Sequence, residues 1–247
     1  MSATLIRVLL VGTLSALLPM ASVRAAQLSP LANIEPKSRH SATAAKGVHF
    51  IYMVRHGDCV HDSLDTDERT TEPLTTLGHE QARLIGERLA GLRVKFDRLI
   101  SSDLLRAAQT ADDMGRIMRM VPTRDSLLDE CAPTSTDPYR MTHENPRKAV
   151  ACDSARARAW RRYFVPTPDR DTYDLLVCHA HVIRWTLAKA VGTDIRSWPH
   201  NDSANAALSI FAVFADSSVR LVTYNDTGHI PVGLQTWSGR GGGWYPE

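Results

Sequence analysis

The fold is decided by an apolar run that ends abruptly in a charged turn, Val48-His49-Phe50-Ile51-Tyr52-Met53-Val54-Arg55-His56-Gly57-Asp58. The apolar part is too short for a typical helix, so it predicts a buried strand. Strands buried on both faces belong to parallel sheets, which bind ligands beyond the carboxyl ends of their strands. Arg55 and His56 follow the strand directly and are therefore expected at a ligand-binding edge.

Further strands and helices alternate along the chain. Periodic or continuous apolar runs predict helices at 77–89, 103–118, 154–164 and 182–191, and strands at 96–100, 121–127, 173–178, 207–214 and 219–224. Thr75 and Thr76 are possible caps of the first helix. The alternation predicts an α/β fold of three layers, in which a mostly parallel sheet carries helices on both faces. The last two strands predict an antiparallel hairpin at the sheet edge.

The amino-terminal residues are typical of a targeting segment. Arg7 precedes an apolar stretch from Val8 to Met20, and Val23-Arg24-Ala25 provides small residues at a cleavage spacing. We therefore predict a signal peptide at 1–25, a linker at 26–46, the domain at 47–238 and a flexible tail at 239–247. This organisation predicts an exported protein, periplasmic or secreted, with no membrane attachment after leader removal. An uncleaved anchor is the alternative, and a mitochondrial leader is disfavoured because such leaders are Arg-rich and amphipathic.

The composition bears on partners and cofactors. The 247 residues carry a formal charge of +2, which provides no bulk attraction to nucleic acid or membranes. Four cysteines, Cys59, Cys131, Cys152 and Cys178, allow two disulfides in three pairings, although Cys178 is typical of a buried free thiol. No pair of cysteines has metal-ligand spacing and the histidines are scattered, so we expect neither a metal nor a cofactor.

The Arg-His-Gly turn contains groups that phosphoryl transfer requires. A neutral imidazole such as His56 can attack phosphorus, and the guanidinium of Arg55 can clamp the phosphoryl oxygens. Gly57 lets the backbone turn and approach a ligand closely. Arg106 is expected near the start of the helix at 103–118, where a purely structural arginine would oppose the helix dipole and a bound anion would explain it.

Two further segments offer a second histidine and a carboxylic acid. His179 directly follows the strand at 173–178 and is favoured over His181, which points away in most turn geometries. A general acid is needed for the leaving group, and Glu130 is the first candidate and Asp129 the second. Taken singly, each has an ordinary structural alternative, a capping histidine or a solvated loop carboxylate.

These segments together resemble the histidine phosphatase superfamily, also called phosphoglycerate-mutase-like. The resemblance spans about Val48 to Gly228 and includes the run at 74–82, Leu-Thr-Thr-Leu-Gly-His-Glu-Gln-Ala. Within the superfamily, residues 178–185, 205–209 and 226–228 are similar to the mitochondrial phosphoglycerate-mutase-like serine/threonine phosphatases. The resemblance implies roles for six residues: His56, Glu130 and His179 in catalysis, with His56 becoming a phosphohistidine, and Arg55, Arg106 and Gly57 in substrate binding.

The resemblance implies a metal-independent phosphatase with no cofactor. A phosphomutase is the alternative enzyme, but Asp58-Cys59-Val60-His61-Asp62 replaces the Glu-Thr segment that small-substrate members usually carry, and its negative charge disfavours a second phosphate pocket. A catalytically silent binding module of the same fold is the non-enzyme alternative. A phosphorylated small molecule and a phosphoprotein are both open as partners, and the oligomeric state is not predicted. The basic helix face that includes Arg156 is expected to be solvated.

Overall fold

The computed structural model describes residues 47–61 and 69–237. The predicted signal peptide, linker and tail lie outside these residues, so the predicted boundaries at 25, 46 and 238 stay predictions. Within the described ranges, no helix is sufficiently long and apolar to cross a membrane.

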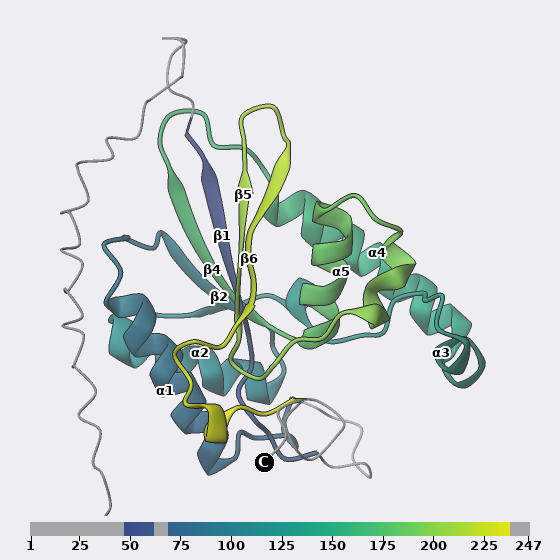
Figure 1. The fold of residues 1–247 in the computed structure, drawn as a ribbon, viewed down its shortest axis with the longest axis horizontal. Coiled ribbons are helices and arrows are strands. Elements are labelled where there is room, and N and C mark those ends of the chain that lie inside the picture. The colour runs from purple at the N-terminus through teal and green to yellow at the C-terminus, as the bar shows by residue number, and fades with distance from the viewer. Residues whose placement is uncertain (1–46, 62–68, 238–247) are drawn as a thin grey trace, which may run out of the picture. The chain divides into compact units, whose positions relative to one another are not determined.

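A single mixed sheet forms the centre of the fold, with strands in the order β3-β2-β4-β1-β5-β6 (Figure 1). The strands are β1 His49–Arg55, β2 Arg98–Ser101, β3 Thr123–Arg124, β4 Thr172–Cys178, β5 Leu208–Val213 and β6 Val219–Asp226. The first four strands run parallel to one another, whereas β5 pairs antiparallel with both β1 and β6. The predicted α/β class, mostly parallel sheet and antiparallel edge hairpin are therefore confirmed.

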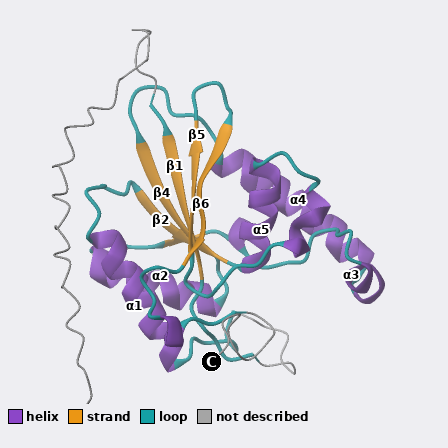
Figure 2. Cartoon of the chain, in the orientation of Figure 1, coloured by secondary structure: helices purple, strands orange, loops and turns teal. Residues whose placement is uncertain are grey.

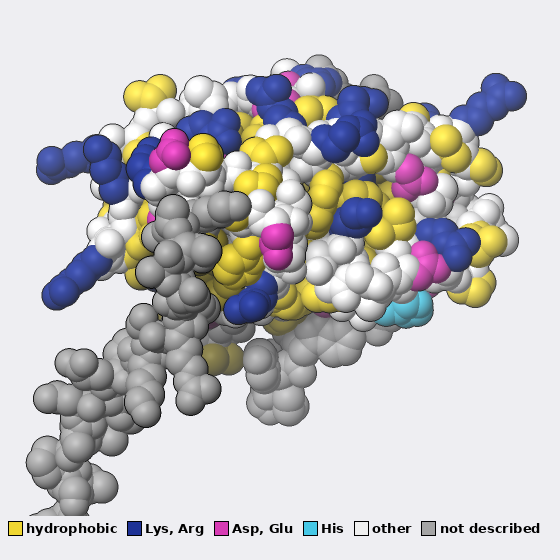
Figure 3. Space-filling view, turned by 90° about the horizontal axis from the view of Figure 1, so that it is seen from above, with side chains coloured by type: hydrophobic (Ala, Val, Ile, Leu, Met, Phe, Trp, Pro, Cys, Tyr) yellow, Lys and Arg dark blue, Asp and Glu magenta, His cyan; other side chains and the backbone are white. Residues whose placement is uncertain are grey.

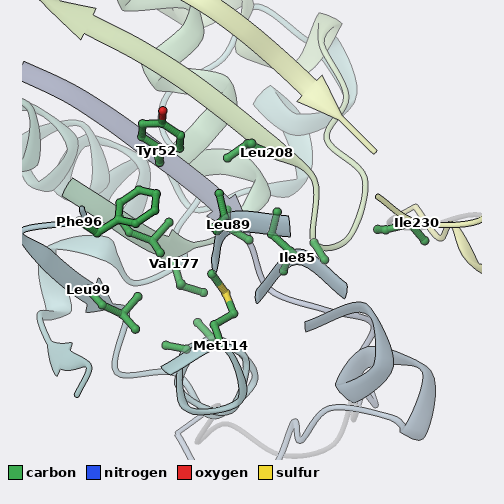
Figure 4. Close-up of a cluster of buried hydrophobic side chains, with 14 residues drawn as sticks. Tyr52, Ile85, Leu89, Phe96, Leu99, Met114, Val177, Leu208 and Ile230 are labelled. Atoms are coloured by element: carbon green, nitrogen blue, oxygen red, sulfur yellow. The ribbon is translucent and has the colours of Figure 1, made fainter. Parts of the chain in front are cut away.

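Helices cover both faces of this sheet (Figure 2). Helices α1 (Thr76–Ala90) and α2 (Leu105–Met118) pack on one face, and α4 (Pro146–Tyr163) and α5 (Ala180–Ala190) pack on the other. Because successive strand residues point to opposite faces, Tyr52 and Val54 of β1 enter the first core layer and Ile51 and Met53 enter the second. Figure 4 shows the first layer, in which Tyr52 is drawn with side chains of the covering helices, Ile85, Leu89 and Met114.

Strand register brings the predicted site residues to one edge. β1 pairs with β4 so that Arg55 lies beside Cys178, and His56 and His179 are the next residues along each strand. The amide of Ser102, the first residue after β2, donates to the β4 backbone at 3.0 Å. The carboxyl ends of three neighbouring parallel strands thus converge, as the sequence predicts.

Some segments differ from the sequence prediction because local capping overrides apolar patterning. The strand expected at 121–127 shortens to β3, since the carboxylate of Asp125 accepts the Leu127 amide at 3.0 Å and starts a 3-10 helix, Ser126–Leu128. The helix expected at 154–164 begins at Pro146 instead, because Asn145 caps it. Short helices form at α3 Pro138–His143, Ile195–His200 and Val232–Leu234, where the apolar pattern is too short to predict them.

Charged side chains are mixed on the face of the molecule that Figure 3 shows, which is the end of the sheet where β1 begins in Figure 1. Lys and Arg side chains lie dispersed there among acidic and hydrophobic ones, and do not merge into one basic patch.

The turn after β1 is fixed to the start of α1 by two glycines in close contact. A side chain at Gly78 would overlap the carbonyl oxygen of Asp58, and a side chain at Gly57 would overlap the backbone of Gly78. Thr75, the helix cap, donates through Oγ1 to the Asp58 carboxylate at 2.7 Å and accepts the Gly78 amide at 3.0 Å. Gly57 has no left-handed backbone angle, so its place is explained by the approach of α1 and not by an unusual turn.

We expect a Gly78→Ala substitution to destabilise the protein by about 1–3 kcal/mol, the usual cost of overpacking, although alanine normally favours helices. The matched control is Gly91→Ala at the end of the same helix, where the nearest atoms to an added Cβ lie 3.5 Å away. Chemical unfolding of both variants measures the difference. Equal stability of the two would show that the contact between the turn and α1 is not tight.

Candidate active site

His56 is a buried histidine, and one of its two ring nitrogens forms a hydrogen bond within the protein. Its Nδ1 lies 2.7 Å from the carbonyl oxygen of Gly57, which can only accept, so Nδ1 carries the proton. Burial, followed by the positive charges of Arg55 and Arg106, lowers the pKa of His56 well below its ordinary value. The ring is therefore neutral with its lone pair on Nε2, which is the form that attacks an electrophile.

His179 lies beside His56, with ring centroids 5.1 Å apart. Its Nε2 is 2.8 Å from Ser102 Oγ, and that hydroxyl donates to the carboxylate of Asp129 at 2.7 Å. The Ser102 oxygen therefore accepts a hydrogen bond from Nε2–H. The Nδ1 of His179 is buried and has no hydrogen-bond partner among the described residues. Burial, followed by His56 and Arg106, lowers the pKa of His179 well below its ordinary value.

Two buried guanidinium groups flank the histidines. Arg55 and Arg106 are 2% and 4% exposed. Arg55 donates to the carbonyl of Ser203, and Arg106 Nη1 donates to Glu72 Oε2 at 2.5 Å. Burial lowers the pKa of Arg55 to about 10, while the nearby Glu130 opposes that shift, so the group stays charged at neutral pH. Two cations beside two neutral imidazoles favour an anionic ligand.

Glu130 and Asp129 have different environments although they are adjacent. Asp129 is fully engaged, because Oδ1 accepts from Ser102 and from the Asp103 amide, and Oδ2 accepts from Arg69 at 3.0 Å. The Oε1 of Glu130 has no hydrogen-bond partner among the described residues. Glu130 thus has a carboxylate oxygen available to a ligand, whereas Asp129 is connected to His179 through Ser102.

His181 contacts Glu130, contrary to the prediction that it points away from the site. Its Nδ1 is 3.5 Å from Glu130 Oε1, and its ring centroid is 4.4 Å from that of Trp198. The first turn of α5 folds His181 back over the loop that carries Glu130. Burial lowers the pKa of His181, and Glu130 opposes this shift. The His-Ala-His spacing does not predict this contact, because it depends on the path of a loop that is distant in the sequence.

Helix α4 anchors the backbone on both sides of Glu130. The sequence predicts a solvated Arg156, but this prediction is wrong, because the side chain is only 2% exposed. Its Nη2 donates to the carbonyl of Asp129 at 2.6 Å. A disulfide joins Cys131 to Cys152, one helical turn before Arg156. The two cysteines outside this bond, Cys59 and Cys178, are both buried free thiols, as expected for Cys178.

One group of potential metal ligands lies next to these residues within the described ranges: Cys59, His61 and Glu72. Sequence spacing does not predict this group, because its members come together only when two separate segments pair. Glu72 also accepts from Arg106, so the group adjoins the arginines of the site.

Comparison with known proteins identifies the family. The profile of the histidine phosphatase superfamily (branch 1) matches residues 51–150 and 144–227. The chain belongs to this superfamily. The predicted resemblance is thus confirmed, and His56, Arg55, Arg106, Glu130 and His179 are brought together in one histidine phosphatase domain.

Curated relatives cover most of the chain. The chain is 32% identical over 203 residues to serine/threonine-protein phosphatase PGAM5, mitochondrial, of Rattus norvegicus. The aligned region covers 80% of this chain and 69% of the rat protein. The human protein of the same name is 33% identical over 193 residues, covering 76% and 65%. The Drosophila mojavensis protein is 32% identical over 216 residues, covering 82% and 73%.

Solved structures share the fold. Phosphoserine phosphatase of Entamoeba histolytica matches with a TM-score of 0.56 at 17% identity, covering 74% of this chain and all of that one (100%). Phosphoglycerate mutase of Plasmodium falciparum matches with a TM-score of 0.52 at 22% identity, covering 75% and 96%. At these identities the likeness establishes the phosphoglycerate-mutase-like fold alone.

The predicted export is wrong. The relatives from rat, human and fly are all named as mitochondrial proteins, which contradicts a signal peptide and a periplasmic or secreted location. The physical reason is that a short apolar stretch behind one positive charge, such as Arg7, is a feature shared by several kinds of targeting segment. Residues 1–25, on which that prediction depends, lie outside the described residues.

Because His56 and His179 are held neutral, stability should fall as the pH falls below the ordinary histidine value of about 6.5. The unfolded chain then takes up protons that the folded chain does not, so stability is fully present above that value and is lost below it. Each such histidine contributes up to about 1.4 kcal/mol per pH unit to the slope. Chemical unfolding between about pH 7 and pH 5 should give a shallower slope for His179→Asn than for the wild type. An unchanged slope, equal to that of the exposed control His143→Asn, would show that His179 is not buried neutral.

Proposed function

We propose that this chain hydrolyses phosphomonoesters through a phosphohistidine on His56, and that its substrates are proteins phosphorylated on serine or threonine. The observation that carries the proposal is the neutral His56 whose Nδ1–H is bound to Gly57, with Arg55 and Arg106 beside it. The names of the curated relatives support a serine/threonine phosphoprotein as the substrate class.

In the first step, the phosphoryl group binds between Arg55, Arg106 and His179. Negative charge in the site favours a proton on the free Nδ1 of His179, which then donates to a phosphoryl oxygen. His56 Nε2 attacks phosphorus, the bond from phosphorus to the ester oxygen breaks, and protonated Glu130 gives its proton to that oxygen.

In the second step, the phosphoryl group leaves the enzyme. The Glu130 carboxylate takes a proton from water, the water oxygen attacks phosphorus, and the bond from phosphorus to His56 Nε2 breaks. Phosphate departs, the imidazole returns to its neutral form, and Glu130 is protonated again for the next cycle.

We also propose that turnover requires no metal ion. Phosphoryl transfer needs positive charge around the oxygens and a stabilised leaving group. Arg55 and Arg106 supply that charge as buried guanidinium groups, and Glu130 supplies the proton. These are the functions that a divalent cation performs in other phosphoryl-transfer enzymes.

A phosphomutase is less well supported than a phosphatase. A mutase must hold a second phosphate near the first, and this requires additional positive charge. The segment beyond His56 instead carries the carboxylates of Asp58 and Glu72, and that of Glu72 accepts a hydrogen bond from Arg106. A silent binding module would not need a carboxylate such as Glu130, whose Oε1 accepts no hydrogen bond from the described residues, beside a neutral nucleophile.

The proposal is tested by phosphate release from phosphoserine and phosphothreonine peptides and from p-nitrophenyl phosphate. We expect His56→Ala to lose at least about a thousandfold in turnover while its unfolding transition is retained, and His143→Ala, an exposed control, to keep normal activity. Added chelator should not lower the rate. Normal turnover by His56→Ala contradicts the mechanism, whereas net transfer of phosphate to a phosphorylated acceptor identifies a mutase.

We expect Glu130→Gln to slow an alkyl phosphate by at least about a hundredfold, because its alkoxide leaving group requires a proton. The same variant should largely spare p-nitrophenyl phosphate, whose leaving group is stable as an anion. Asp129→Asn should slow both substrates alike, since Asp129 orients His179 through Ser102. Equal losses on the two substrates in Glu130→Gln would exclude Glu130 as the acid, and a selective loss in Asp129→Asn would assign the role to Asp129.

A further inference from the structure

A short antiparallel bridge brings three side chains of metal-binding types close together beside the proposed phosphate site. Cys59 bridges to Leu74, and the amide of Val60 donates to the carbonyl of Pro73 at 2.9 Å. The same register places His61 opposite Glu72. Because alternate residues of a strand point to one face, the side chains of Cys59, His61 and Glu72 share a face of this pairing.

The donor atoms of this group are close enough to share one ion. His61 lies between the other two, with Nε2 at 3.9 Å from Cys59 Sγ and Nδ1 at 4.0 Å from Glu72 Oε1. One donor atom from each residue lies within 4.8 Å of the other two. Ligands of a tetrahedral zinc ion are separated by roughly 3.3–3.7 Å, given metal–ligand bonds of about 2.0–2.3 Å. His61 offers one of its two ring nitrogens to the ion, and because its side chain is 68% exposed, the ring can turn to bring that nitrogen nearer to both partners.

The chemistry of the donors selects the ion. A thiolate, an imidazole and a carboxylate together suit Zn²⁺, whereas Mg²⁺ and Ca²⁺ prefer sets made only of oxygen. Cys59 is 7% exposed and the Glu72 side chain 14%, so two of the three donors are largely shielded from water. Binding breaks the Cys59 S–H bond, forms the Zn–S bond and releases the proton to solvent.

Glu72 connects this group to catalysis. Its Oε1 faces His61, while its Oε2 accepts from Arg106 Nη1 at 2.5 Å. An ion bound to Glu72 would weaken the pairing of this carboxylate with Arg106. Arg106 would then bind an anionic ligand more strongly. Three protein ligands also leave a fourth zinc position for an oxygen ligand such as phosphate. Both effects retain product phosphate in the site.

We propose that Cys59, His61 and Glu72 form a Zn²⁺ site whose occupation inhibits the enzyme by slowing the release of phosphate. The inhibition rests on the proposed phosphatase function, whereas the binding of the ion does not. Catalysis itself proceeds without the ion, so zinc acts here as a regulator of a metal-independent reaction.

The binding test uses the full chain with its disulfide intact. Titration with Zn²⁺ should show one ion bound per chain, and Co²⁺ should give the absorption band of a cobalt–thiolate bond. Cys59→Ser should abolish the band, and His61→Ala should weaken Zn²⁺ affinity by at least about tenfold. The exposed control His143→Ala should bind as the wild type does. Absence of binding, or binding unchanged in both Cys59→Ser and His61→Ala, overturns the site whatever the enzyme's activity.

The inhibition test compares rates with and without Zn²⁺. In the wild type, Zn²⁺ should lower kcat for p-nitrophenyl phosphate and make inorganic phosphate a stronger inhibitor, and chelator should reverse both effects. His61→Ala should keep its metal-free activity and lose the sensitivity to Zn²⁺. Stoichiometric binding with unchanged kinetics would overturn the inhibitory role, and absence of any phosphatase activity without zinc would instead contradict the proposed function.

Discussion

The hydrogen bond from His56 Nδ1 to the carbonyl of Gly57 determines which nitrogen of His56 attacks phosphorus in the proposed mechanism. It fixes the tautomer, so that the lone pair is always on Nε2. The carbonyl is held in place because Gly57 and Gly78 approach too closely for any side chain, and because Thr75 ties the same turn to α1. Gly57 and Gly78, which belong to two separate motifs, therefore both help to fix the direction of the Nε2 lone pair of His56.

The electrostatics of the site follow from burial. Removing the histidines from water keeps them neutral, while Arg55 and Arg106 stay charged beside them. Such a cluster destabilises the empty protein at low pH and favours a bound dianion. Helix α4 contributes rigidity, since Arg156 and the Cys131–Cys152 disulfide hold the backbone around Glu130, the acid of the proposed mechanism.

Features encoded locally could be predicted from sequence, and features that depend on packing between distant segments could not. The strand before Arg55 and the position of His179 follow from apolar runs and strand ends, and their convergence follows from the geometry of parallel sheets. Neither the contact of His181 with Glu130 nor the burial of Arg156 leaves a local signal. Arg156 lies on a helix that is polar in sequence, and only the folded loop at Asp129 explains its burial. The predicted export failed because a leader segment carries little physical information beyond one charge and an apolar stretch.

The most direct test of this account is the chemical identity of the covalent intermediate. Wild-type protein quenched during turnover of a phosphomonoester should contain an acid-labile phosphohistidine, which peptide mapping and phosphorus NMR can assign to a residue and a ring nitrogen. We expect phosphate on Nε2 of His56, because Nδ1 is bound to the Gly57 carbonyl. Phosphate on Nδ1 of His56, on His179, or on no histidine would contradict it.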